Sequence, residues 1–154
     1  MNLIILNIKI CFLQAILVYG KTFMSNCIAN ELLKKGKTVL YQTAPVLLET
    51  VVSNKMTRNK TSKQQEFYRN VLECDLLIID DLGTEFLNSM LLSELFTILN
   101  TRLLNFNSKI TKTIISTNLS IEEIFRKYEE RIGSRIAGYY DIYHFFGEDL
   151  RLKR

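Results

Sequence analysis

Three short polar segments carry the residue types that handle phosphate groups and a divalent metal ion. Gly20-Lys21-Thr22 offers an ammonium group and a hydroxyl, Asp80-Asp81 two adjacent carboxylates, and Thr117-Asn118 a hydroxyl and an amide. In such sites a lysine spans the phosphates, while a carboxylate and a hydroxyl hold Mg²⁺. Each segment alone is a weak signal, because a lone G-K-T is common and Asp-Asp after a strand also describes a solvated acidic turn.

The residues that precede Asp80 predict a buried strand that positions the two carboxylates. Residues 76–79 are four consecutive large aliphatics. This run is too uniform for a half-exposed strand and too short for a helix, so it fits a strand of a parallel sheet that is covered on both faces. The carboxylates then follow at the carboxyl end of the strand, where open α/β sheets bind their ligands. Acids at that place require a cationic partner.

Other segments alternate in the same way along the chain. Strands are predicted at residues 16–19, 38–42, 76–79, 111–116 and 141–146, and helices at 23–35, 46–52, 64–72, 90–103 and from 121 onward. About five strands alternating with helices indicate a doubly wound parallel sheet. The three polar segments follow three of these strands, so they are expected to meet at one edge of the sheet. Together they suit a nucleoside triphosphate with Mg²⁺ and a positioned water.

Composition limits the class of protein. The 154 residues suffice for one domain with a core, and 47% hydrophobic with 23% charged residues is typical of a globular chain rather than a disordered one. Three cysteines without a C-x-x-C pair argue against a disulfide framework or a zinc site. The formal charge of +4 is compatible with a polyanionic partner but does not require one.

The first residues are apolar and form no recognisable element. Lys9 interrupts the apolar run, and neither a basic n-region nor a small-residue cleavage site is present, which argues against a signal peptide. The uninterrupted apolar length also falls short of a membrane-spanning helix, so a membrane anchor is the less favoured alternative. We therefore expect residues 1–15 to be an atypical apolar leader and residues 16–154 to be a single domain.

A basic stretch lies between the second and third predicted strands. Residues 54–63 carry four cations and no acid, and they show no apolar periodicity, so an exposed loop is predicted. The cations are Lys55, Arg58, Lys60 and Lys63. They form either a solvated surface or a contact with nucleic-acid phosphates.

Several segments, including the spacers between the motifs, are similar to those of a known family. LLIIDDLGTE, GKTFMSNCIANELLKKGKTVLYQTAP, TIISTNLS and YEERIGSRIAGYY resemble AAA+ ATPases of the DnaC/IstB type over about residues 16–151. These are bacterial replicative-helicase loaders, primosomal proteins and transposition helper ATPases. The resemblance implies a three-layer P-loop NTPase core with a roughly five-stranded parallel sheet. It also implies a cytoplasmic protein, not associated with membranes, that self-associates through an ATP interface and acts on single-stranded DNA with a replicative helicase or a transposase.

The resemblance assigns roles to the residues at one edge of the predicted sheet. Gly20 and Lys21 match the Walker A glycine and lysine that bind the phosphates of ATP. Thr22 and Asp80 match the hydroxyl and the Walker B carboxylate that bind Mg²⁺. Asp81 occupies the position of the residue that activates water.

It also assigns roles to residues later in the chain. Asn118 matches the sensor of the γ-phosphate. Arg131 or Arg135 matches the arginine supplied across the subunit interface, with Arg135 preferred, and Arg151 is a candidate for the second sensor. The basic stretch follows the second strand, where helicase loaders carry a DNA-contacting insertion.

Two departures from the family pattern bear on activity. The family normally has an N-terminal partner-binding domain, whereas this sequence is expected to start almost at the first strand. The first predicted strand also runs directly into Gly20, as though about five residues of the phosphate-binding loop were missing. The G-x-x-x-x-G-K-[ST] pattern has a glycine at the position of Ala15. A loop that short would lower ATP affinity sharply. The alternatives are therefore a DNA-replication ATPase, a transposition helper, and a non-hydrolysing remnant that binds only DNA or protein.

Overall fold

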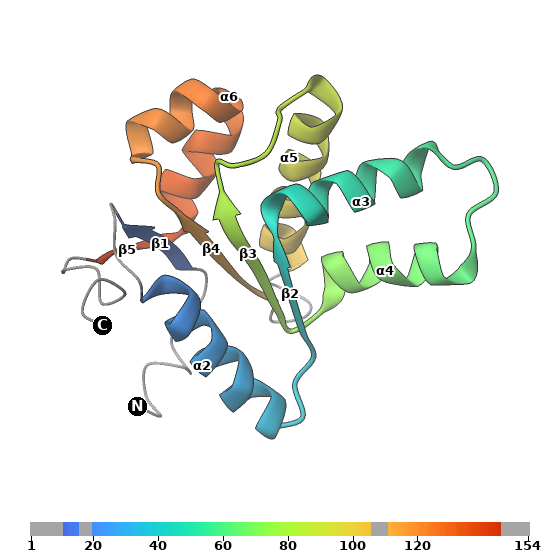
Figure 1. The fold of residues 1–154 in the computed structure, drawn as a ribbon, viewed down its shortest axis with the longest axis horizontal. Helices are drawn as coiled ribbons and strands as arrows, with labels where there is room; N and C mark the ends of the chain where they lie inside the picture. Colours follow the sequence, from blue (N-terminus) through green and yellow to red (C-terminus); the bar gives the residue numbers. More distant parts are fainter. Residues whose placement is uncertain (1–10, 16–19, 106–110, 146–154) are drawn as a thin grey trace, which may run out of the picture.

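The computed structural model describes residues 11–15, 20–105 and 111–145 as an α/β structure (Figure 1). The strands are β1 (Cys11–Ala15), β2 (Val39–Thr43), β3 (Leu76–Leu82), β4 (Lys112–Thr117) and β5 (Asp141–Phe145). The helices are α2 (Lys21–Lys34), α3 (Ala44–Met56), α4 (Ser62–Glu73), α5 (Ser89–Leu104) and α6 (Ile121–Tyr139). No helix within these residues combines the length and the apolar composition that a membrane crossing requires.

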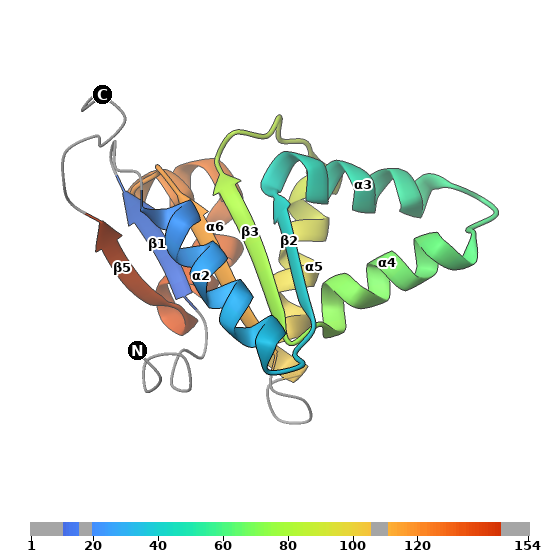
Figure 2. The same ribbon diagram turned by 60° about the horizontal axis from the view of Figure 1, so that its bottom comes forward.

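The strands form one sheet in the order β2-β3-β4-β1-β5, and every neighbouring pair is parallel. The predicted α/β class with a parallel sheet is therefore confirmed. In a parallel sheet the carboxyl ends of all strands lie at one edge, which Figure 2 shows at the arrowheads of β1 and β3. The start of α2 lies beside these arrowheads. The fold thus gathers the segments that follow β1, β3 and β4 at one place.

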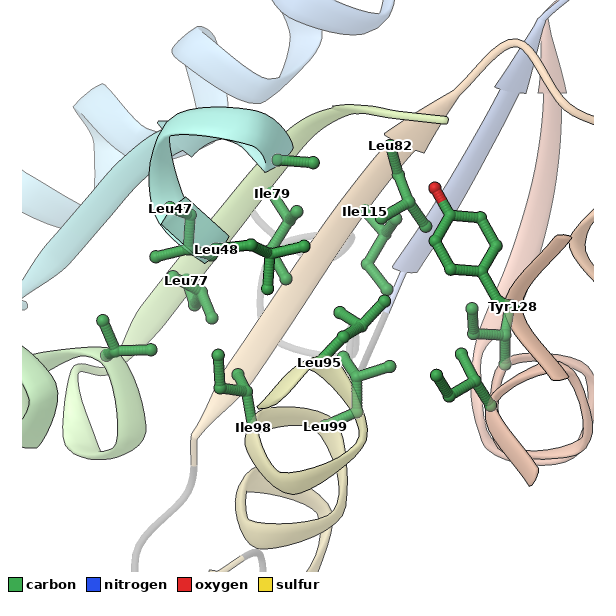
Figure 3. Packing of buried hydrophobic residues seen from close by; sticks show 14 of the residues in the cluster. Leu47, Leu48, Leu77, Ile79, Leu82, Leu95, Ile98, Leu99, Ile115 and Tyr128 are labelled. Carbon is green, nitrogen blue, oxygen red and sulfur yellow. The ribbon is translucent and has the colours of Figure 1, made fainter. Parts of the chain in front are cut away.

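Helices cover both faces of the sheet, and alternate residues of β3 pack against different helices because their side chains point to opposite faces. Leu77 and Ile79 belong to a large core cluster with α3, α5 and α6 (Figure 3). Leu76 and Ile78 belong to a smaller cluster beneath α2. All four side chains are buried, and each contributes about 1.5–3 kcal/mol relative to an exposed position. This explains why the strand is apolar without alternation.

The position of the first strand corrects the sequence prediction. The sequence predicts a strand at residues 16–19, which lie outside the described residues, and assigns residues 1–15 to a leader. In the structure Cys11–Ala15 is β1 and pairs with both β4 and β5. The apolar run extends on both sides of Ala15, so composition alone could not locate the strand within it. Residues 11–15 are therefore part of the sheet.

The same correction changes the length of the predicted phosphate-binding segment. Because β1 ends at Ala15 and α2 begins at Lys21, residues 16–20 separate them. The G-x-x-x-x-G-K-[ST] pattern likewise places five residues between its first glycine and its lysine. The prediction of a segment shortened by about five residues is therefore wrong. The remaining departure from the pattern is one of composition, with Ala15 at the first glycine position.

The helices that flank the basic stretch are longer than the sequence predicts. Helix α3 continues to Met56 and α4 begins at Ser62, so only residues 57–61 lie outside a helix. Helix α4 begins with a capping box in which Thr61 and Gln64 each bond to the other's backbone N–H. Lys55 and Lys63 are consequently helical. The predicted ten-residue loop is reduced to a short connection between two antiparallel helices (Figure 1).

Helix α6 begins as predicted and then bends. Ser120 and Glu123 form the capping box expected from their spacing. The helix is interrupted at Tyr128 and Glu129, and Glu129 has a φ of 67°. The Tyr128 hydroxyl donates to Glu85 Oε1, and Lys127 Nζ donates to the carbonyl of Gly83. These contacts join the bend to the segment that follows β3.

Candidate functional site

Lys21, the first residue of α2, connects that helix to the end of β4. Its side chain is only 6% exposed. Lys21 Nζ donates to the Thr117 carbonyl at 3.0 Å and to Asn118 Oδ1. Burial lowers the pKa of Lys21, while the negative charges of Asp81 and Asp80 act in the opposite direction. The predicted meeting of Gly20-Lys21-Thr22 with Thr117-Asn118 at one sheet edge is therefore observed.

The Asp80 carboxylate lies at the centre of the cluster and is 4% exposed. Its Oδ2 accepts hydrogen bonds from Thr22 Oγ1, at 3.2 Å, and from the Tyr41 hydroxyl. Its Oδ1 accepts from Ser116 Oγ and from the backbone N–H of Asp81, at 3.1 Å. A buried carboxylate surrounded by hydroxyl groups and close to a lysine suits a cation.

The donor set agrees with Mg²⁺ in particular. Thr22 and Asp80 contribute a hydroxyl and a carboxylate oxygen in contact, and Mg²⁺ is held by few protein oxygens together with phosphates and water. Within the described residues no group of three or more His, Cys, Asp or Glu side chains gathers in a way that could hold a metal ion. A site in which Thr22 and Asp80 would share a metal ion with phosphates and water fits these residues.

Asp81 is exposed and lies in an irregular part of β3. Between two paired positions β3 advances from Ile79 to Leu82 while β4 advances from Ile115 to Thr117, so β3 contains one extra residue. Asp81 has a φ of 55°, which is uncommon outside glycine. Such bulges and strained residues concentrate near functional sites, where they redirect a side chain. Here the bulge turns Asp80 inward and leaves Asp81 on the surface.

Arg131 and Arg135 share one face of α6, as their spacing predicts. Both guanidinium groups stack on the Phe96 ring of α5, at 4.8 Å and 4.3 Å from its centroid. Arg135 also donates to Asn100 Oδ1 at 3.0 and 2.9 Å, and Arg131 pairs with Glu129 at 2.9 Å. Among the contacts of the described residues, those of the two arginines go to α5 and α6, away from Lys21 and Asp80.

The basic side chains of the α3–α4 region do not share one environment. Lys55 forms an ion pair with Glu94 at 2.6 Å and lies 4.9 Å from the centroid of the Tyr68 ring. Arg58, Lys60 and Lys63 are exposed around the connection between the helices. Lys55 therefore differs from the other three predicted cations, because it holds α3 against α5. Arg151 lies outside the described residues.

Two site residues were not predicted from the sequence. Tyr41 belongs to the predicted second strand and Ser116 to the predicted fourth, and both contact Asp80. Burial, reinforced by the neighbouring Asp80 carboxylate, raises the pKa of Tyr41, so its hydroxyl remains a donor at neutral pH. Ser116 had a usable signal, since it lies two residues before Asn118 in a polar strand end. Tyr41 had none, because aromatic residues are common in buried strands.

Comparison with known proteins identifies the family. The sequence matches the family model of the bacterial DnaA ATPase domain over residues 7–139. The chromosomal replication initiator protein DnaA of Campylobacter jejuni is 30% identical over 118 residues, which make up 77% of this chain and 25% of that protein. The chain thus spans about a quarter of the length of such curated relatives.

Two solved structures show the same fold. Replication initiator DnaA bound to AMPPCP and single-stranded DNA aligns with a TM-score of 0.77 at 21% identity, over 96% of this chain and 44% of that chain. The DnaC helicase loader aligns with a TM-score of 0.75 at 19% identity, over 94% of this chain and 85% of that chain. The predicted resemblance is confirmed at the AAA+ level, while the narrower DnaC/IstB assignment stays a prediction. Because the family model matches most of its length, the chain belongs to the bacterial DnaA ATPase domain family of AAA+ proteins.

Proposed function

We propose that this chain is an ATP-binding replication protein that couples ATP binding and hydrolysis to the loading of a replicative helicase on single-stranded DNA. The observation that supports this function best is the contact set at the sheet edge. There Lys21 reaches Asn118, while Thr22 reaches Asp80. The residues that bind phosphate and metal in this family are thus in mutual contact, although they come from α2, β3 and the end of β4.

Each residue has a distinct task in this proposal. Lys21 would neutralise the phosphates in place of its bond to Asn118 Oδ1. Asn118 would donate to the γ-phosphate through its amide N–H group. Thr22 and Asp80 would hold Mg²⁺, which would neutralise the charge of the phosphates. Asp81, on the exposed side of the bulge, orients and deprotonates the attacking water.

Similar proteins of known structure and the charge of the surface support the proposed partners. One relative is a DnaA bound to AMPPCP and single-stranded DNA, and another is a DnaC helicase loader. Arg58, Lys60 and Lys63 provide exposed positive charge for a DNA strand. Arg135, with Arg131 beside it, is proposed to act on the ATP of a neighbouring copy, since its own contacts go to α5 rather than to Lys21.

One observation favours a second candidate function. Ala15 takes the place of the first glycine of the phosphate-binding pattern. Glycine at this position of the pattern allows the backbone to approach a phosphate closely, so its replacement in the sequence favours a module that binds DNA or protein without hydrolysing ATP. A transposition helper with a transposase partner remains the third candidate, and it shares the ATP chemistry of the first.

The nucleotide site is tested by titrating a fluorescent ATP analogue in the presence of Mg²⁺. Lys21→Ala is expected to weaken binding at least tenfold, because it removes the cation that faces the phosphates. Lys34→Ala, at the exposed far end of the same helix, is the matched control and should bind like the wild type. Equal affinity of Lys21→Ala and the wild type would contradict the proposal.

Hydrolysis is tested separately by the release of inorganic phosphate. The first candidate predicts a rate that Asp80→Asn abolishes. Binding of the analogue without any phosphate release would instead establish the non-hydrolysing candidate. Comparing stimulation by a replicative helicase with stimulation by a transposase would separate the first candidate from the third.

A further inference from the structure

The Asp80 carboxylate is surrounded by hydroxyl groups from three different elements. Thr22 comes from the first turn of α2, Tyr41 from β2 and Ser116 from β4. The proposed nucleotide site uses Thr22 as a metal ligand, but it gives no role to Tyr41. The Tyr41 hydroxyl nevertheless bonds to Oδ2, the same oxygen that accepts from Thr22.

The two carboxylate oxygens differ in what holds them. Oδ1 accepts from Ser116 Oγ and from the backbone N–H of Asp81. Oδ2 faces Thr22 and Tyr41. A hydroxyl that would bind a metal ion through an oxygen lone pair can still donate its proton, so Thr22 could keep its bond to Oδ2. The Tyr41 hydroxyl is the second side-chain donor to this oxygen, and unlike Thr22 it would not itself be a metal ligand.

We propose that Tyr41 is a positioning residue for Mg²⁺, which holds Asp80 Oδ2 in the orientation in which the carboxylate binds the metal. This inference rests on the proposed nucleotide site and adds a residue to it. Hydrogen-bond partners of ligating groups fix ligand orientation, and their removal typically costs 10–100-fold in metal affinity. Tyr41 acts through Asp80 rather than by contacting substrate.

The hydroxyl and the ring of Tyr41 contact different parts of the protein. The ring is partly buried and packs on the cluster of Leu76, Ile78 and Ile114 beneath α2. Phenylalanine at this position keeps the ring and its packing and removes only the hydroxyl, with its bond to Asp80 and its contact with Thr22. Tyr41→Phe is therefore expected to fold like the wild type and to report on the hydroxyl alone.

The test is a Mg²⁺ titration of fluorescent ATP-analogue binding on the full 154-residue chain, with a parallel measurement in EDTA. Tyr41→Phe is expected to raise the half-saturating Mg²⁺ concentration about tenfold or more while leaving the Mg²⁺-free affinity unchanged. A purely structural role would change both affinities together. Tyr139→Phe removes an exposed tyrosine hydroxyl at the end of α6 and is the matched control.

The outcomes separate this inference from the function on which it rests. If the wild type shows Mg²⁺-dependent binding and Tyr41→Phe requires the same Mg²⁺ concentration within twofold, the positioning role is overturned and the nucleotide site stands. If the wild type shows no Mg²⁺-dependent binding, the nucleotide site itself is refuted, and the role of Tyr41 with it. A proportional loss with and without Mg²⁺ also overturns the role, because it indicates damage to the fold.

Discussion

At the scale of single residues, Arg102 is a charged group that the fold places in its interior. Its side chain is 1% exposed, and it lies at the start of β3 and β4, the edge opposite the candidate site. The guanidinium donates to the carbonyls of Val71, Cys74 and Lys112 and to Thr113 Oγ1. Burial lowers the pKa of Arg102, and the position in the last turn of α5 favours its positive charge.

Replacing this residue should therefore destabilise the protein. Arg102→Ala leaves several buried carbonyl groups without a donor, and each costs about 1–3 kcal/mol. We expect the free energy of unfolding, measured by urea denaturation, to fall by at least about 3 kcal/mol. Arg69→Ala, which alters an exposed arginine of α4, should change it by less than about 0.5 kcal/mol. Similar losses for the two variants would show that Arg102 is not a structural centre.

Residues such as Arg102 and Tyr41 mark the limit of what the sequence can predict. Hydrophobic patterns identify β3, the stripe of α5 and the capped start of α6, because each depends on local composition. Contacts between elements depend on register and on which face each residue occupies. Arg102 looks in the sequence like an ordinary helix-terminal cation, and Tyr41 like a strand aromatic. The paired residues of the candidate site were predictable only because they follow strands of one parallel sheet.

At the scale of elements, the helical pair α3–α4 projects beyond the sheet with its connection at the far end (Figure 2). The sequence predicts a long loop there, since four cations without apolar periodicity resemble solvated coil. In the structure the ion pair of Lys55 with Glu94 holds the last turns of α3 on α5. The exposed cations thus occupy the tip of a supported pair of helices, which presents them in a defined arrangement.

This arrangement predicts that the exposed cations bind DNA and that Lys55 stabilises the fold. A triple change of Arg58, Lys60 and Lys63 to alanine should weaken single-stranded DNA binding and lower the slope of log K against log salt by about 2, since each phosphate contact contributes about 0.7. Fluorescence anisotropy across a salt series measures both quantities. The control variant changes Lys34, Lys35 and Lys37, near the end of α2, to alanine. It has the same net charge as the first triple variant and should alter the slope little.

Lys55 provides the internal contrast for that experiment. Lys55→Ala should leave the salt slope unchanged but lower the free energy of unfolding by about 1–2 kcal/mol, because it leaves the Glu94 carboxylate buried without its cation. If Lys55→Ala lowers the slope as the other cations do, its ion pair opens on DNA and the assignment of Lys55 to structure is wrong. Equal salt slopes for the two triple variants would show that the α3–α4 pair is not the DNA contact.

At the scale of the whole molecule, several tyrosines occupy places where they must stay protonated. Tyr128 and Tyr140 are buried, on the face of the sheet covered by α5 and α6. Burial raises the pKa of both hydroxyls above the ordinary value of 10.0, and for Tyr128 the Glu85 carboxylate raises it further. The folded protein therefore retains protons that the unfolded chain releases above pH 10.

This difference fixes the sign of the alkaline pH dependence. Above about pH 10 the unfolded state binds fewer protons than the folded state, so the free energy of unfolding falls as pH rises, by about 1.4 kcal/mol per pH unit for each such tyrosine. The stabilising contribution is fully present below pH 10. Tyr140→Phe removes one of these groups and should flatten the decline by about 1.4 kcal/mol per pH unit in urea unfolding between pH 10 and 11.5.

Tyr139→Phe alters an exposed side chain at the end of α6 and is the matched control, so it should follow the wild-type curve. The lowered pKa of Lys21 changes the free energy of unfolding with pH in the direction opposite to the tyrosines, but it does not affect the comparison between the variants. Just below pH 10.5, the ordinary pKa of a lysine, Lys21 is more fully protonated in the unfolded chain than in the folded protein. The free energy of unfolding therefore gains a contribution that rises with pH, and this contribution is the same in the wild type and in both variants. Parallel curves for Tyr140→Phe and the wild type would show that Tyr140 ionises without unfolding, and that this side of the core is more open to solvent than its packing indicates.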